Sequence, residues 1–92
     1  VTAGRDGSWV YDGSRGCHIA APDIQAVNPI GSGDAYAAGV AAGLLRGMDL
    51  VDACRLGAAC GAANAMTQDA GHVELTTVET LFQQTSVRPL PV

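Results

Sequence analysis

The stretch from Asn28 to Tyr36 constrains the fold of this chain more than any other, because it joins a strand-like run to a helix-like run. Its sequence is Asn-Pro-Ile-Gly-Ser-Gly-Asp-Ala-Tyr, with the strand-like run Ile-Gln-Ala-Val (24–27) before it and an alanine-rich run after it. Pro29 forces the residue before it into an extended conformation, so the strand should end there. Gly31 and Gly33 then allow a sharp turn without a Cβ in the way. A turn of this kind at a helix start gathers unpaired N–H groups at the positive end of the helix dipole, which predicts an anion site.

Asp34 separates this stretch from an ordinary phosphate-binding loop, because it places a carboxylate in the first helical turn. A carboxylate there repels a bound phosphate unless it has a chemical role. One such role is to accept the proton of a hydroxyl group that attacks the phosphorus. The alternative is that Asp34 only stabilises the helix N-terminus, where aspartate is favoured. A plain helix cap does not require the two glycines on either side of Ser32, which favours the first interpretation.

The same stretch, followed by Ala38-Gly39, resembles the second signature of the ribokinase-like (PfkB) carbohydrate kinases. In that family a glycine-rich loop ending in aspartate forms an anion hole and supplies the catalytic base. The resemblance therefore implies an anion hole made by Gly31, Ser32 and Gly33, with Asp34 as the base. The sequence departs from the common pattern in Ser32, where alanine is commoner, and in the Asn-Pro opening, where Asp-Thr is common. Neither departure affects the proposed base.

Two further segments, 2–7 and 64–73, extend the resemblance over residues 1 to about 73. The Asn-Pro opening and the later segment 64–73 are most similar to the 1-phosphofructokinase and tagatose-6-phosphate kinase branch. The resemblance implies that the nucleotide phosphates lie along a Thr-x-Gly-x-x-Gly segment, and that a later helix borders the adenine pocket. The nucleotide-binding candidates are then Thr2, Gly4, Gly7 and Asn64. Without the family context, segment 2–7 is a simple turn, and Asn64 is an amide hydrogen-bonded to nearby backbone.

The resemblance implies an α/β fold, the C-terminal part of a three-layer α/β/α arrangement of the ribokinase type. A chain of 92 residues allows one domain at most. It begins on what resembles the end of a strand, so we expect an incomplete kinase domain over residues 1–85 and a tail over 86–92. The sugar-binding half and a lid would then precede this segment, a homodimer could form through that lid, and the isolated piece should be inactive.

Local patterns predict short strands followed by helices. Asp-Gly at 12–13 favours a hairpin turn, Gly47 a helix stop and Asp49 a helix start. Thr76 and Glu79 fit a capping box. The first helix is apolar almost all round, so we expect it to be buried on more than one side, with a glycine pair at 39 and 43 allowing close packing. The expected strands are 8–11, 17–21 and 24–27, and the expected helices are 33–46, 49–67 and 77–84.

Charge and cysteine content exclude several classes of function. The formal charge is −4, with five arginines and no lysine, which argues against nucleic acid or an anionic membrane as partner. The three cysteines form no CxxC pair, which favours reduced thiols in a cytoplasmic protein. Cys54 and Cys60 should face different sides of one helix. The two histidines are isolated, so no metal site is expected from protein ligands here.

Two classes of function remain. The first is ATP-dependent phosphorylation of a sugar hydroxyl, most similar to kinases of hexose phosphates, with Mg²⁺ bridging the ATP phosphates. The second is a non-catalytic nucleotide-binding or structural module of the same fold. A dinucleotide-binding loop is excluded because Tyr36 stands where the third glycine is needed. The identity of the sugar would depend on residues outside this segment.

Overall fold

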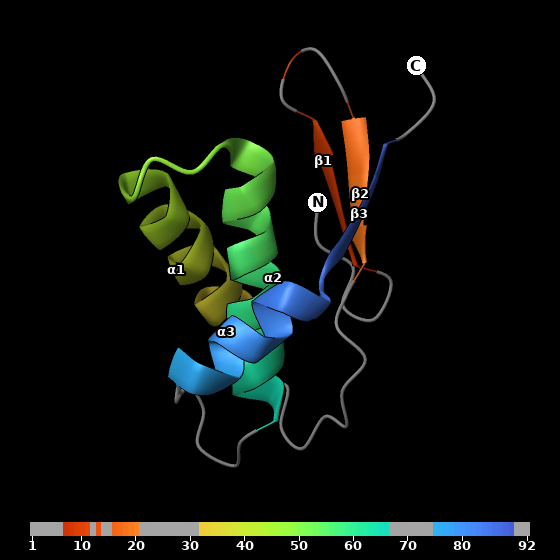
Figure 1. Ribbon diagram of the computed structural model, residues 1–92. Coiled ribbons are helices and arrows are strands. Elements are labelled where there is room, and N and C mark those ends of the chain that lie inside the picture. Colours follow the sequence, from red (N-terminus) through yellow and green to blue (C-terminus); the bar gives the residue numbers. More distant parts are fainter. Residues whose placement is uncertain (1–6, 12, 14–15, 21–31, 67–74, 90–92) are drawn as a thin grey trace.

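The computed structural model describes residues 7–11, 13, 16–20, 32–66 and 75–89. Along the chain these form β1 (Ser8–Tyr11), β2 (Gly16–Ala20), α1 (Ser32–Leu45), α2 (Leu50–Ala65), α3 (Leu75–Gln84) and β3 (Ser86–Pro89). The three helices lie on one side of the three-stranded sheet, and α2 is the central element because it contacts α1, α3, β1 and β2 (Figure 1). The predicted strand at 24–27 and the turn at 2–6 lie outside the described residues.

The sheet is antiparallel, with the strands in the order β1-β2-β3. The predicted hairpin is confirmed, since Val10 pairs with Cys17 and Gly13 in the connection has a φ of 97° that favours glycine. Alternate residues of the hairpin point inward. Val10, Cys17 and Ile19 are buried together, in contact with the middle of α2. The hairpin is thereby fixed against the helix pair.

The prediction of a tail over residues 86–92 is wrong for residues 86–89. These residues form β3, which pairs with β2 so that Ala20 lies opposite Ser86 and Cys17 opposite Pro89. Two prolines close together favoured an unstructured end, but an edge strand needs to donate from only one side, and Pro89 stands at its last position. All four residues of β3 are exposed. The described sheet therefore ends in an open edge strand.

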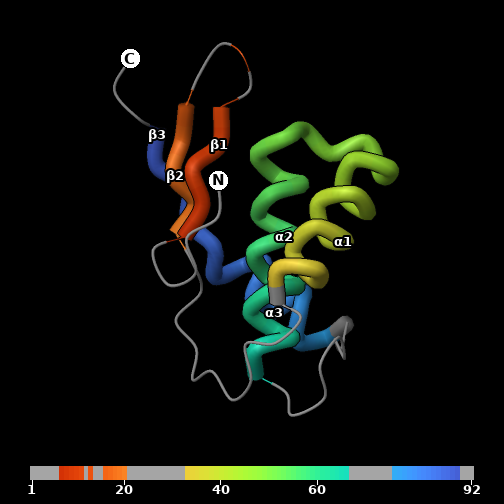
Figure 2. Tube along the Cα trace, turned by 180° about the vertical axis from the view of Figure 1, so that it is seen from behind, coloured from red at the N-terminus to blue at the C-terminus, as the bar shows by residue number. Residues whose placement is uncertain are grey.

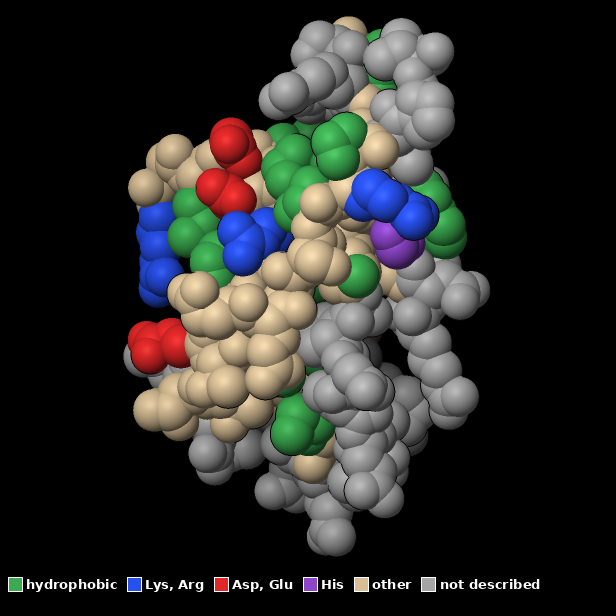
Figure 3. Space-filling view, turned by 45° about the vertical axis from the view of Figure 1, so that its right-hand side comes forward, with side chains coloured by type: hydrophobic (Ala, Val, Ile, Leu, Met, Phe, Trp, Pro, Cys, Tyr) green, Lys and Arg blue, Asp and Glu red, His purple; other side chains and the backbone are tan. Residues whose placement is uncertain are grey.

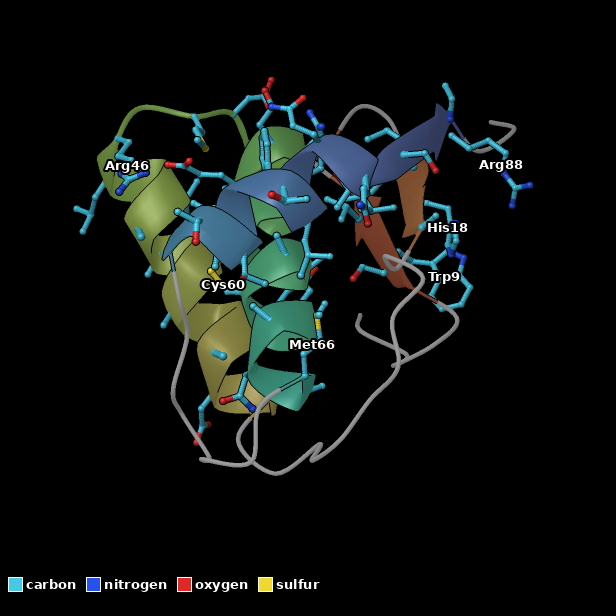
Figure 4. The ribbon with its side chains drawn as sticks, turned by 60° about the horizontal axis from the view of Figure 1, so that its bottom comes forward. Trp9, His18, Arg46, Cys60, Met66 and Arg88 are labelled. Carbon is cyan, nitrogen blue, oxygen red and sulfur yellow. The ribbon has the colours of Figure 1, made fainter. Side chains whose placement is uncertain are left out.

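One row of side chains crosses the outer face of the sheet. Trp9 pairs with His18, and His18 pairs with Arg88, so the three strands each contribute one member. The rings of Trp9 and His18 lie 4.9 Å apart at a tilt of 56°. Figure 4 shows the three labelled side chains on the side of the sheet away from the helices, and Figure 3 shows basic and histidine side chains adjacent on this face. The row gives the sheet a polar and aromatic outer surface.

Helices α1 and α2 are in direct backbone contact through their glycines. A Cβ atom on Gly39 would lie 2.8 Å from the Cα of Gly57, and one on Gly43 would lie 2.9 Å from the Cα of Ala53. The predicted close packing at the glycine pair is thus confirmed. The expectation that α1 is buried on more than one side is wrong for the described residues, because only Gly39 and Gly43 are buried along residues 33–45 of the helix. The many alanines of this helix have side chains too small to form a second packing surface.

Helix α2 begins and ends close to the predicted positions. The Asp49 carboxylate accepts a hydrogen bond from the Asp52 N–H at 2.8 Å, which confirms Asp49 as the N-cap. The helix ends at Ala65, two residues before the predicted end at Thr67. Cys54 packs with the hairpin, whereas Cys60 packs with the cluster shared by α2 and α3, so the prediction of different faces is confirmed. Figure 4 labels Cys60 on the side of α2 near α1 and α3.

Helix α3 begins at Leu75, so Thr76 lies inside its first turn and the prediction that Thr76 is the cap is wrong. The helix thus begins two residues before the predicted start at residue 77. Its apolar residues Val78 and Leu81 still pack on α2. Thr76 and Glu79 have the spacing of a capping box, but the helix begins one residue before Thr76, so Thr76 cannot be its cap.

Arg55 fastens the end of α3 to α2. Its Nε donates to Thr85 Oγ1 at 2.8 Å, and one terminal nitrogen donates to the Phe82 carbonyl at 3.1 Å. The guanidinium carbon also lies 4.3 Å from the centre of the Phe82 ring. The pair with Asp52 is partly exposed and contributes little. Arg55 therefore positions the junction from which β3 enters the sheet.

Candidate functional site

The first turn of α1 carries three of the predicted site residues. The helix begins at Ser32, so Gly33 and Asp34 follow directly in the same turn, whereas Gly31 lies outside the described residues. Unpaired backbone N–H groups collect at such a helix start. Ser32, Gly33 and the candidate base Asp34 thus lie at the positive end of one helix dipole.

The space beside Gly33 in this turn is open among the described residues. Both Gly33 and Asp34 are exposed, and a Cβ atom on Gly33 would meet nothing within 4 Å. This contrasts with Gly39, Gly43 and Gly57, where a Cβ would meet backbone or side-chain atoms closer than 3.0 Å. Packing inside the described residues therefore gives no reason for glycine at position 33. A phosphate group could approach the backbone here, and an exposed carboxylate could accept a proton beside it.

Tyr36 connects this turn to the sheet, and sequence reasoning missed this role. Its hydroxyl donates a hydrogen bond to Ser8 Oγ at 2.8 Å. Burial raises the pKa of Tyr36 above its usual range, so the hydroxyl keeps its proton and remains a donor at neutral pH. The only sequence signal was an aromatic residue within an alanine- and glycine-rich run. That signal excluded a third glycine at this position but gave no partner.

Gly7 is the one member of the predicted nucleotide segment that the structure describes, since Thr2 and Gly4 lie outside the described residues. It is buried and has a φ of 86°, a conformation that favours glycine. It directly precedes Ser8, the acceptor of the Tyr36 hydrogen bond. The end of the predicted nucleotide segment is thereby connected to the helix turn that carries Asp34.

Asn64 lies near the C-terminal end of α2. Because α1 and α2 run in opposite directions, this end lies beside the start of α1 (Figure 2). The Asn64 side chain is 0% exposed, and among the described residues no buried side-chain nitrogen or oxygen lacks a hydrogen-bond partner. Complete burial favours the alternative of a satisfied amide. The nucleotide contact stays a prediction.

Other reactive groups in the described part of the chain are not arranged for chemistry. Burial raises the pKa of the Cys54 and Cys60 thiols, which disfavours the reactive thiolate form. Within the same residues no group of three histidine, cysteine, aspartate or glutamate side chains could hold a metal ion. No helix described here is long and apolar enough to cross a bilayer. The start of α1 is therefore the candidate site.

Sequence comparison identifies relatives of this chain. The family described as "pfkB family carbohydrate kinase" matches residues 1–77. A tagatose-6-phosphate kinase of Staphylococcus epidermidis is 32% identical over 87 residues, which cover 95% of this chain and 28% of the relative. The chain thus spans less than a third of the length of the curated relatives that it matches.

Solved structures resemble the fold closely. A suspected phosphofructokinase of Staphylococcus aureus has a TM-score of 0.89 at 30% identity, over 98% of this chain and 29% of that protein. The ribokinase of Thermotoga maritima has a TM-score of 0.82 at 21% identity, over 90% of this chain and 29% of that protein. These likenesses confirm the predicted fold class, an α/β segment of a ribokinase-like fold.

Proposed function

The chain belongs to the pfkB family of carbohydrate kinases, and from that premise we propose that the full-length protein transfers the γ-phosphoryl group of ATP to a sugar hydroxyl. The observation that supports this most directly is the start of α1, where Gly33 leaves open space and Asp34 presents an exposed carboxylate. A helix start with this composition suits a phosphoryl group and a proton acceptor together.

The proposed reaction assigns one role to each part of the turn. The sugar hydroxyl loses its proton to the Asp34 carboxylate while its oxygen bonds to the γ-phosphorus, and the bond to the leaving ADP oxygen breaks. The backbone N–H groups of Gly31, Ser32 and Gly33 hold the transferred phosphoryl group. The charge that develops on its oxygens is stabilised by these groups and by the helix dipole.

The nucleotide phosphates would lie along segment 2–7, with Thr2, Gly4 and Gly7 as the candidate contacts. Asn64 is the remaining candidate for the adenine side, but its complete burial favours the alternative of a hydrogen-bonded structural amide. Mg²⁺ bound to the ATP phosphates would neutralise part of their charge. We expect its protein ligands to lie outside this segment, as part of the same proposal.

We propose a hexose phosphate as the acceptor, of the tagatose-6-phosphate or fructose-1-phosphate type. This part of the proposal is supported by the relative named tagatose-6-phosphate kinase, which matches nearly the whole of this chain. Residues of the full-length protein outside this segment would bind the sugar phosphate. A panel of tagatose 6-phosphate, fructose 1-phosphate and fructose 6-phosphate, each with ATP, would identify the preferred acceptor.

The Asp34→Asn variant of the full-length protein tests the mechanism. Asparagine keeps the size of the side chain and serves about as well as aspartate at a helix start, so the melting temperature should change little. The kcat should fall by about 10²- to 10⁴-fold, the usual contribution of a positioned base, while ATP affinity is retained. Turnover within about threefold of the parent enzyme, a change of under about 0.7 kcal/mol, would contradict the role of Asp34. ATP binding by the parent without turnover on any sugar phosphate would favour the non-catalytic module.

A further inference from the structure

We propose that Tyr36 and Ser8 form a positioning pair that fixes the helix turn bearing Asp34 relative to the end of the nucleotide segment. This inference rests on the proposed kinase function and extends it to two residues that have no role in the reaction as proposed above. Neither residue would touch the substrate. Their role would be to keep a fixed distance between the helix turn that bears Asp34 and the end of the nucleotide segment at Gly7.

The hydrogen bond joins parts of the chain that are distant in sequence. Tyr36 and Ser8 are 28 residues apart, and the Tyr36 oxygen lies 2.8 Å from Ser8 Oγ. Tyr36 follows Asp34 by two residues in the same helical turn, and Ser8 directly follows Gly7. The Ser8 residue is only 3% exposed, so water cannot readily replace this contact. The bond thus joins the residue after Gly7 to the helix turn that carries Asp34.

The backbone of Tyr36 is held on its other side by α2. A Cβ atom on Gly57 would lie 2.7 Å from the Tyr36 carbonyl oxygen and 3.2 Å from its ring atom Cδ1. Tyr36 therefore rests directly on the Gly57 backbone while its hydroxyl reaches β1. With both ends of the residue in contact, the first turn of α1 has little freedom to shift or rotate against the sheet.

This rigidity has a specific consequence for phosphoryl transfer. The reaction needs the attacking oxygen, the base and the phosphorus in line, and displacements of about 1 Å can lower rates by about 10²-fold. A side chain anchored to a rigid strand and a rigid helix supplies that precision better than a loop contact does. Loss of the Tyr36 hydroxyl should accordingly affect the chemical step more than ATP binding.

The experiment is a double-mutant cycle in the full-length enzyme with Tyr36→Phe, Ser8→Ala and the combined variant. Each single variant should lower kcat by about tenfold and change the KM for ATP by less than about threefold, because the geometry is lost but the binding groups remain. The combined variant should be no slower than the slower single variant, since both remove one interaction. Assays are run well below the melting temperature of every variant, so that unfolding does not contribute.

The chain offers a matched control in Tyr11→Phe. The Tyr11 hydroxyl also donates a hydrogen bond, to the Gly13 carbonyl at 3.1 Å, but that contact spans two residues and Tyr11 is 71% exposed. This variant should keep the kinetics of the parent. A purely structural role for Tyr36 predicts a lower melting temperature with unchanged kcat, and that result would overturn the proposal. Fully additive effects of Tyr36→Phe and Ser8→Ala on kcat would overturn it as well.

The parent and the Asp34→Asn variant are measured in the same series. If Asp34→Asn loses turnover while Tyr36→Phe does not, the positioning pair is wrong and the proposed function stands. If the parent phosphorylates no member of the sugar-phosphate panel, the proposed function and the positioning pair are both overturned. If Tyr36→Phe lowers kcat while Asp34→Asn does not, the assignment of the base fails instead.

Discussion

Gly39 and Gly57 bring the backbones of α1 and α2 into direct contact, since a Cβ atom on Gly39 would lie 2.8 Å from the Gly57 Cα and 3.0 Å from the Leu56 carbonyl oxygen. Two helices usually pack with their axes 8–10 Å apart, with side chains between them. Here the absence of side chains at the crossing lets the backbones meet. The orientation of α1, and with it the candidate site at its start, depends on this contact.

The first prediction is that Gly39→Ala destabilises the protein. The added Cβ would clash with backbone atoms, which can move only if the helices separate, and such overpacking typically costs about 1–3 kcal/mol. The higher helix propensity of alanine offsets this loss of stability by up to about 1 kcal/mol. We expect a net decrease in the free energy of unfolding, measured by denaturant titration of the full-length protein. An unchanged or increased stability would show that α1 can move away without cost.

The second prediction concerns Gly33→Ala, where the same chemical change meets open space. Stability should be retained or increase by up to about 1 kcal/mol, because the residue lies in a helix. Activity should fall by roughly 10- to 100-fold if the backbone here must approach a phosphoryl group closely. Steady-state kinetics and a melting curve on one preparation are sufficient. Parental activity would remove Gly33 from the proposed anion hole.

The third prediction separates the two roles considered for Asn64 by means of Asn64→Leu. A nucleotide contact predicts that the KM for ATP rises by roughly 5- to 30-fold, the effect of losing about 1–2 kcal/mol of hydrogen bonding. A satisfied buried amide predicts a loss of stability of about 1–3 kcal/mol, because its partner is left unpaired. Since the side chain is completely buried, we expect the loss of stability with little change in KM. A raised KM in a stable variant would restore the nucleotide role.

The fourth prediction is a loss of stability at alkaline pH. Burial raises the pKa of Cys54 and Cys60 above the ordinary thiol value of 9.0 and raises that of Tyr36 above 10.0. The folded protein therefore holds these protons where the unfolded chain has lost them, so stability is complete below about pH 9 and falls as the pH rises further. The melting temperature should decline less steeply above about pH 9 in a Cys54→Ala/Cys60→Ala variant than in the parent. Parallel declines would show that other groups dominate.

Signals carried by neighbouring residues predicted the helices well. Asp49 was predicted as a cap and accepts the expected hydrogen bond, and Gly47 follows α1 with a φ of 84°. The placement of Ser32, Gly33 and Asp34 at a helix start was predictable for the same reason, because a glycine turn before an alanine-rich run is a local pattern. Each of these features depends on residues within one or two turns of each other.

Features that depend on distant partners could not be predicted. The strand β3 is stabilised by pairing with β2 and by the attachment of its preceding turn to Arg55, and neither partner is visible in the sequence around Pro89. The exposure of α1 was missed because alanine and glycine are compatible with both buried and exposed positions. The Tyr36 hydrogen bond to Ser8 spans 28 residues and has no sequence signature.

The pairing of β2 with β3 sets an order for events during synthesis. Ala20 cannot pair with Ser86 until Ser86 has been synthesised, 66 positions later in the chain. At ordinary translation rates this takes roughly 3–13 s. Until then β1 is the only one of the described strands with which β2 can pair, and a two-stranded hairpin alone is marginally stable in water. The Arg55 contact with Thr85 can form only once Thr85 has been made, one residue before β3 begins. The sheet of this segment is therefore completed after the ribosome has passed α3, and the edge of β2 is vulnerable to unwanted pairing throughout that interval.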